Sequence, residues 1–201
     1  MKYPLKAVVH CTDGRIGHLN YVIVDTRKEK VSHVVVKDHK SHNKKYLVPS
    51  RWIKDTTSEL ILLDRTKSDI RALDLFEEND FAQVMVRGYA VDPKITELWP
   101  HMVEAKKIYA ARRRQVPVGE TAVSLHARVH ATDGRIGEVY EFIVEPSTWQ
   151  ITHLIVRKGR PWNKNQVSIP VTAIERIEED RILLNINKAD VKKLPATPVE
   201  R

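Results

Sequence analysis

Two aspartates, Asp13 and Asp133, are the first residues in this sequence whose side chains could carry out acid–base chemistry. Each lies in the stretch TDGRIG, which occurs twice, 120 positions apart. Asp before Gly is typical of a hairpin turn, because Asp tolerates positive φ and hydrogen-bonds to its own backbone. We therefore interpret both aspartates as structural, with a catalytic carboxylate as the alternative. The repeated hairpin residues are Asp13, Gly14, Gly17, Asp133, Gly134 and Gly137.

Histidine and cysteine side chains do not form a recognisable metal or catalytic set. His39 and His42 follow Asp38 with a spacing that metal ligands can have, but a zinc site needs three or four converging ligands. Cys11 is replaced by Ala131 in the second copy, and its surroundings contain no catalytic His-Asp arrangement. The sequence also lacks a P-loop and the GxGxxG, GxSxG and HExxH motifs. We expect a protein that is not an enzyme and that holds no metal and no cofactor.

Positive charge is concentrated in the first part of the chain. The formal net charge is +8, and residues 1–76 carry 15 Lys and Arg against 9 Asp and Glu. Such an excess is compatible with an anionic partner, such as RNA, a membrane surface or an acidic protein, or simply with solubility.

Three basic clusters are candidate contacts for a partner. The first lies in a loop, the second combines a loop with an exposed aromatic residue, a composition used to stack bases or anchor proteins, and the third lies between the copies. Their members are Lys40, Lys44 and Lys45; Arg160, Trp162 and Lys164; and Arg112, Arg113 and Arg114.

The elements around these residues follow the same order in both copies. A short strand, the TDG turn and a longer strand come first, and Gly17 and Gly137 inside the longer strand predict a bulge or a sharp coil. Two further strands follow, the second ending at Pro49 or Pro170, and then a fifth strand and a short helix. Five short strands and tight turns predict an all-β protein built of two small antiparallel barrels in tandem.

The domain organisation follows from the duplication. We expect a first unit over 1–76, a second unit over 121–201, and a linker over 77–120 that is partly helical and packed against a barrel. Helices are expected around Ile95–Trp99 and over Val103–Arg113, since prolines interrupt anything longer.

The ordered set of motifs in the second copy resembles the PRC-barrel domain. These motifs are VHATDGRIGEVYEFIVEP, THLIVRKG, VSIPVTAI and RILLNI, and the first copy is similar with Val48-Pro49 at the Ile-Pro position. The resemblance implies a small barrel that acts as a docking module, as in the H subunit of photosynthetic reaction centres and in the ribosome maturation factor family. We expect neither the membrane anchor of the former nor the separate N-terminal domain of the latter, so neither specific role transfers.

Two functions are compatible with these features. The preferred one is a bacterial, non-enzymatic adaptor that docks onto a protein assembly, including one at the cytoplasmic face of a membrane. The alternative is an RNA- or ribosome-associated factor that uses the basic first unit and the linker. One cysteine excludes an intrachain disulfide, and no signal peptide or transmembrane segment is recognisable, so we expect a cytoplasmic protein that can also form homo-oligomers.

Overall fold

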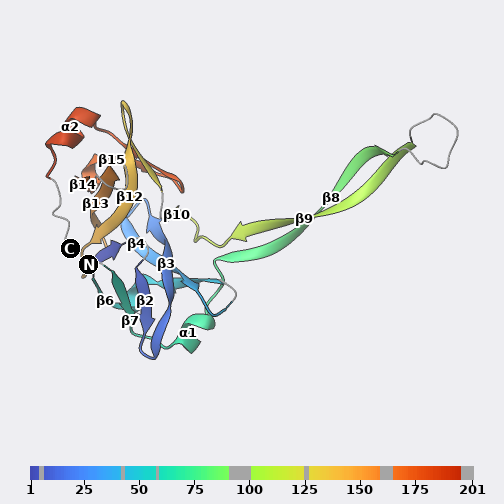
Figure 1. Ribbon diagram of the computed structural model, residues 1–201, viewed down its shortest axis with the longest axis horizontal. Coiled ribbons are helices and arrows are strands. Elements are labelled where there is room, and N and C mark those ends of the chain that lie inside the picture. Colours follow the sequence, from blue (N-terminus) through green and yellow to red (C-terminus); the bar gives the residue numbers. More distant parts are fainter. Residues whose placement is uncertain are drawn as a thin grey trace. The chain divides into compact units, whose positions relative to one another are not determined.

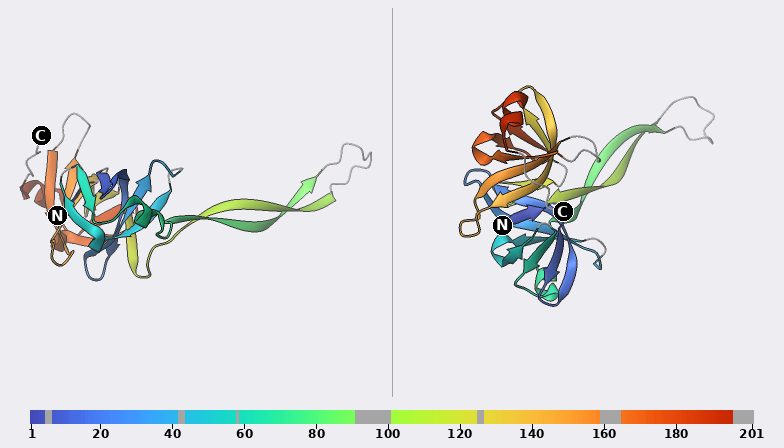
Figure 2. Two further views of the ribbon diagram at one scale, coloured as in Figure 1. Left: turned by 90° about the horizontal axis from the view of Figure 1, so that it is seen from below. Right: turned by 60° about the vertical axis from the view of Figure 1, so that its left-hand side comes forward.

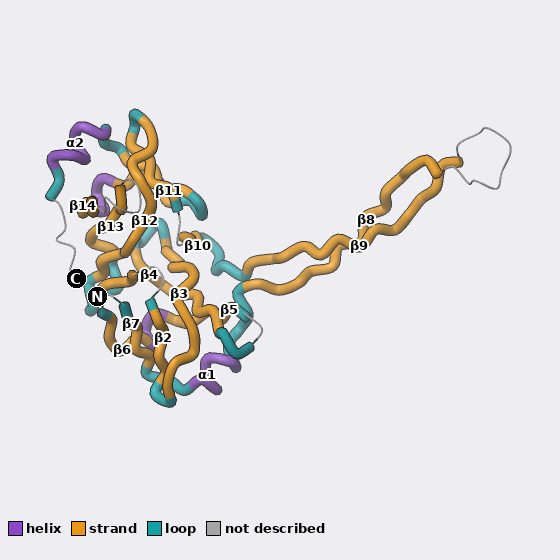
Figure 3. The backbone as a smooth tube through the Cα atoms, viewed as in Figure 1, coloured by secondary structure: helices purple, strands orange, loops and turns teal. Residues whose placement is uncertain are grey.

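The computed structural model describes residues 1–4, 7–41, 44–57, 59–90, 101–124, 127–158 and 165–195, with the backbone alone for 78–113. These residues form two compact units, one of residues 1–76 with 116–201 and one of residues 77–115. Strands dominate (Figure 3), which confirms the predicted all-β class. The described residues contain two α-helices, α1 (Lys67–Arg71) and α2 (Lys188–Lys193), and neither is long and apolar enough to cross a membrane.

The first repeat forms a mixed sheet with the strand order β5-β4-β3-β2-β7-β6. Its strands are β2 (Val8–Cys11), β3 (Gly14–Asp25), β4 (Lys30–Asp38), β5 (Lys45–Pro49), β6 (Ile53–Thr56) and β7 (Leu60–Leu63). The pair β2–β7 is parallel, whereas the other neighbours are antiparallel. The 3₁₀ turn η1 (Ser50–Trp52) follows Pro49, where the sequence predicts a turn.

The second repeat has the same topology, with the order β14-β13-β12-β11-β16-β15 and a parallel β11–β16 pair. Its strands are β11 (Arg128–Ala131), β12 (Gly134–Val144), β13 (Ile151–Lys158), β14 (Asn165–Pro170), β15 (Ile174–Ile177) and β16 (Arg181–Leu184). The 3₁₀ turn η2 (Val171–Ala173) follows Pro170. The two parallel pairs modify the expected purely antiparallel arrangement.

The two repeats exchange their N-terminal strands (Figure 1). Strand β1 (Lys2–Pro4) pairs with β12 of the second repeat, and β10 (Glu120–Ser124) pairs with β3 of the first. Tyr3 pairs with Phe142, and Val123 pairs with Val22. Tyr3 and Val123 are 120 positions apart, as are Val22 and Phe142, so the exchange is symmetric. An isolated bridge between Lys30 and Gln150, also 120 positions apart, marks the pseudo-twofold axis.

Because of this exchange, the core is continuous across the repeats, which lie side by side (Figure 2). Tyr3 and Val123 are fully buried, and the main cluster contains residues of both sheets, among them Val34 and Leu154. Burial of a side chain of this size stabilises the fold by about 1.5–3 kcal/mol. The exchanged strands therefore contribute to one shared core.

The glycines of the repeated hairpin meet two different geometric demands. Gly14 and Gly134 have φ values of 111° and 122°, which disfavour any side chain. At Gly17 the pairing of β2 with β3 shifts register, and the same shift recurs at Gly137, which confirms the predicted bulge.

The segment between the repeats is a two-stranded hairpin. Strands β8 (Glu77–Ala90) and β9 (His101–Arg114) pair in antiparallel register from Glu77↔Arg114 to Ala90↔His101. The helix expected over Val103–Arg113 is therefore wrong: its residues have high helix propensity, but they pair continuously with β8 along one edge. Ile95–Trp99 lies outside the described residues, and the expected packing of the linker stays a prediction.

Candidate functional site

The repeated aspartates connect the hairpin turn to the start of the short helix. Asp13 Oδ1 accepts a hydrogen bond from the Lys67 amide at 2.9 Å, and Lys67 Nζ donates to the Asp13 carbonyl at 2.7 Å. In the second repeat, Asp133 Oδ1 accepts from the Lys188 amide at the same 2.9 Å. Each carboxylate thus satisfies an amide of the first helical turn, which has no partner within its helix.

An ion pair between a buried aspartate and an exposed arginine holds the base of the loop that follows β4. Asp38 is fully buried, and its Oδ2 accepts from Arg71 Nε of α1 at 2.8 Å, while its Oδ1 accepts from the Lys40 amide at 2.8 Å. Burial raises the pKa of Asp38, but the bonds from Arg71 and the Lys40 amide outweigh it and hold the pKa below the ordinary value. The Asp38 carboxylate therefore holds the loop in position.

Three basic side chains meet on the surface beside this loop. Arg15 Nη2 lies 3.0 Å from His18 Nε2, and His18 Nδ1 lies 2.5 Å from His39 Nε2. The two imidazole rings meet edge to face, with centroids 4.5 Å apart. The His39 amide donates to the Ile16 carbonyl, which brings the loop back over β3. Lys37 lies directly across the β3–β4 pair from His18.

The equivalent positions of the second repeat carry a charge-balanced pair. Arg135 Nη2 donates to Glu138 Oε1 at 2.7 Å, and Glu138 lies across the β12–β13 pair from Arg157. Glu138 takes the place that His18 takes in the first repeat, 120 positions earlier. The first repeat thus has the same arginine, with a histidine where the second repeat has the carboxylate.

The predicted contact lysines do not form one cluster. Lys40 and Lys44 are exposed, and Lys40 lines a shallow cavity of about 450 Å³ together with Arg15, Ile16 and His39. Lys45 is half-buried, with its Nζ 5.3 Å from the centre of the Tyr21 ring. The structure therefore brings Lys40 to the histidine cluster and directs Lys45 to Tyr21.

The other predicted contact residues give less information. Arg160, Trp162 and Lys164 lie outside the described residues, and the side chains of Arg112 and Arg113 are not described. Arg114 Nε lies 3.6 Å from Glu77 Oε1 across the β8–β9 pair. Within the described ranges, no three His, Cys, Asp or Glu side chains are grouped so that they could hold a metal. His42, part of the weighed metal motif, lies outside those ranges.

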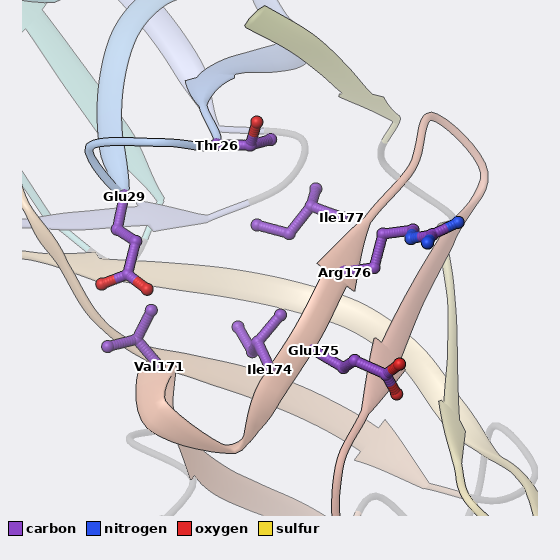
Figure 4. A pocket seen from close by; sticks show the side chains of 7 residues that line it. All are labelled: Thr26, Glu29, Val171, Ile174, Glu175, Arg176 and Ile177. Atoms are coloured by element: carbon purple, nitrogen blue, oxygen red, sulfur yellow. The ribbon is translucent and has the colours of Figure 1, made fainter.

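A second candidate site lies where the two repeats meet (Figure 4). A pocket of about 250 Å³ has an apolar floor of Val171, Ile174 and Ile177, whose side chains point toward the turn between β3 and β4. Glu29 and Thr26 of that turn form the opposite wall. At this size the pocket accommodates one side chain rather than a drug-sized ligand, which needs about 300 Å³ or more. Glu175 and Arg176 complete its lining.

The pseudo-twofold axis relates Glu29 to Trp149, and the two residues differ greatly in size. Both have positive φ, 52° and 62°, and the carbonyl of each accepts a hydrogen bond from the other repeat. Trp149 O accepts from Val31 N, and Glu29 O accepts from Ile151 N. Trp149 is half-buried and packs against the hydrophobic core. Glu29 is smaller and charged, and the pocket of Figure 4, which it lines, stays open beside it.

Sequence reasoning missed both of these sites. The junction pocket needs residues from different repeats that only the strand exchange brings together. The histidine cluster left a readable trace, because the repeated TDGRIG is followed by His18 in one copy and by Glu138 in the other. Comparison of the two copies at divergent positions would have identified it.

Comparison with known proteins supports the resemblance over part of the chain. No curated protein matches the sequence. The PRC-barrel domain is a non-catalytic domain type that suggests a protein-interaction module. Residues 129–191, which extend from β11 to α2 of the second repeat, match the PRC-barrel domain family.

Proposed function

We propose that this chain is a non-enzymatic adaptor that docks onto a protein assembly through a tandem pair of PRC-barrel domains. The observation that carries the proposal is the junction pocket, since it is lined by both repeats and exists only when they are joined. An apolar pocket with a polar rim is the setting in which a single buried side chain of a partner contributes much of the binding energy. The proposal covers a cytoplasmic assembly, including one at the inner face of a membrane.

The tandem assignment is supported by the symmetry of the two repeats. The first repeat has the strand order of the matched second repeat, the same parallel pair and the same register shift at its glycine. The exchanged strands fix the two repeats in one unit, so a partner meets both together. A preformed surface of this kind reduces the entropy lost on binding.

Site-specific photo-crosslinking in the native host tests the proposal. Benzoylphenylalanine replaces Arg176 on the pocket rim, and in a matched control it replaces Asp55, which is the equivalent residue of the first repeat because Pro49 corresponds to Pro170. Position 176 is expected to give discrete protein adducts that position 55 does not give. Identical adducts from both positions, or none from position 176, would contradict docking at the junction.

A second candidate function is RNA or ribosome association, which the cluster at the loop favours. Among the described residues, no carboxylate pairs with Arg15, Lys37 or Lys40. Phosphate-driven binding weakens steeply with salt, whereas docking on an apolar pocket does not. Charge reversal at Lys40, Lys44 and Lys45 is expected to abolish RNA binding if this loop is the site, and unchanged RNA affinity would exclude the loop.

A further inference from the structure

Arg15 and Arg135 occupy equivalent positions in the two repeats but have different side-chain partners. In the second repeat, Arg135 is neutralised by Glu138 at 2.7 Å. In the first repeat, Arg15 faces His18, which cannot supply a negative charge at any pH of interest. The backbone around the two arginines is equivalent, since both follow the same turn and the same bulge. Among the described residues, Arg15 therefore has no carboxylate partner of the kind that Arg135 has.

The hydrogen bonds define the protonation of the histidines. A guanidinium group only donates, so His18 Nε2 must accept from Arg15 Nη2. His18 then carries its proton on Nδ1 and donates it to His39 Nε2 at 2.5 Å. In this arrangement His39 Nε2 is the acceptor. Burial lowers the pKa of His18, and the neighbouring His39, Arg15 and Lys37 lower it further.

The surroundings leave room for an incoming group. Arg15, His39 and Lys40 are exposed and line the shallow cavity of about 450 Å³, whose floor includes the buried Ile16. Lys37 faces His18 from the neighbouring strand and adds positive charge. An anion in this cavity meets Arg15 and Lys40 at once, and it removes the electrostatic cost of placing these cations close together.

We propose that the Arg15–His18–His39 cluster of the first repeat binds the carboxylate of an acidic side chain on a protein partner. This inference rests on the proposed adaptor function, and it adds a specific chemistry to it. The carboxylate supplies Arg15 with the negative charge that Glu138 supplies to Arg135. A carboxylate is favoured over a phosphate because the duplicated backbone already holds a carboxylate at this position in the second repeat.

Nuclear magnetic resonance titration of the full chain with acetylated, amidated tetraglutamate tests this site. We expect saturable shifts of the Arg15 and His39 amides and of the His18 ring. The variant His18→Glu reproduces the second-repeat pair and should weaken binding about tenfold or more, because the built-in carboxylate occupies Arg15.

A matched variant separates the site from overall charge. Lys54→Gln removes one positive charge from an exposed position of the first repeat away from the cluster, and it should bind tetraglutamate like the unmodified protein. The reverse variant, Glu138→His, should expose Arg135 and add a second set of shifting amides around it. The spectrum of each variant also reports whether its fold is intact.

Three outcomes would overturn the inference: unchanged affinity in His18→Glu, equal weakening in Lys54→Gln, or saturation of the site by a uridine decanucleotide but not by tetraglutamate. These outcomes are independent of crosslinking at position 176. If tetraglutamate does not bind but position 176 gives crosslinks, the adaptor function is supported and the carboxylate site is refuted. If the crosslinks fail while the titration succeeds, the cluster binds acids but the junction is not the docking surface.

Discussion

Replacing Gly17 by alanine places a methyl group against the backbone of the neighbouring strand. A Cβ atom at this position would lie 2.8 Å from the carbonyl carbon of Lys37 and 3.2 Å from the Asp38 Cα, and it would overlap the Lys37 carbonyl oxygen. None of these atoms can rotate away, because they belong to the β3–β4 ladder. The two strands must therefore separate locally.

The cost of this separation follows from the geometry. Moving the strands apart by roughly 1 Å lengthens hydrogen bonds of about 2.9 Å beyond useful range. Overpacking costs about 1–3 kcal/mol, and each ladder bond that weakens costs about 1 kcal/mol. We expect Gly17→Ala to lower the free energy of unfolding by about 3–4 kcal/mol. For a unit of this size that corresponds to a fall in melting temperature of about 10 °C.

Thermal unfolding followed by circular dichroism measures this effect. Gly137→Ala should behave alike, since its Cβ would lie 2.9 Å from the Arg157 carbonyl carbon. Lys54→Ala, at an exposed position of β6, is the control and should change stability by no more than about 0.5 kcal/mol. A Gly17→Ala melting temperature within about 2 °C of the unmodified protein would refute the close approach of the two strands.

Three further predictions concern buried ionisable groups. Asp38→Asn removes the charge that pairs with Arg71 and should lower the free energy of unfolding at pH 7 by about 2 kcal/mol in urea titrations. Because the folded-state pKa of Asp38 is depressed, this difference should shrink as the pH falls below about 4; a constant difference contradicts the pairing. Burial, with a smaller effect from Asp13, raises the pKa of Cys11 to about 11, so a thiol reagent at pH 8 should label it no faster than the protein opens; rapid labelling contradicts its burial. Burial also lowers the pKa of His33 in the folded state. Below about pH 6.5 the unfolded state therefore binds a proton at this residue more readily than the folded state does. Stability should fall from pH 8 to pH 5.5, and His33→Gln should reduce that slope; an unchanged slope contradicts this reasoning.

The local structure was predictable where the sequence specifies it through backbone constraints. Asp-Gly turns, a glycine inside a strand and a proline at a strand end each leave few conformations open, and the structure has the hairpin, the bulge and the 3₁₀ turn at these places. The duplication supported these local predictions, because each one could be checked against a second copy of the same pattern.

The strand exchange was not predictable from the hairpins alone. Each repeat could in principle pair its first strand with its own sheet, and the choice depends on the positions of chain segments far apart in the sequence. A trace is present nevertheless, since KYPLKAVVH at residues 2–10 aligns with AVSLHARVH at residues 122–130. This alignment extends the duplication to the exchanged strands.

The linker shows how local propensity can mislead. Residues 103–113 are rich in Ala, Lys and Arg, which favour helices by a few tenths of a kcal/mol per residue. A partner strand of equal length in β8 pairs with one edge of β9 along its whole length, and that pairing outweighs the propensity. The candidate sites likewise depend on pairing partners, so the basic loop was recognisable from sequence but the Arg15–His18–His39 contacts were not.

Sedimentation of a native-host extract through a density gradient tests the central claim that this chain is an adaptor for a protein assembly. The protein is followed across the fractions at low and moderate salt, with and without nuclease. The account predicts migration with a large, nuclease-resistant assembly that persists at moderate salt. Migration with ribosomal subunits that is lost after nuclease or added salt, or migration as a free 23.2 kDa chain under every condition, would contradict it.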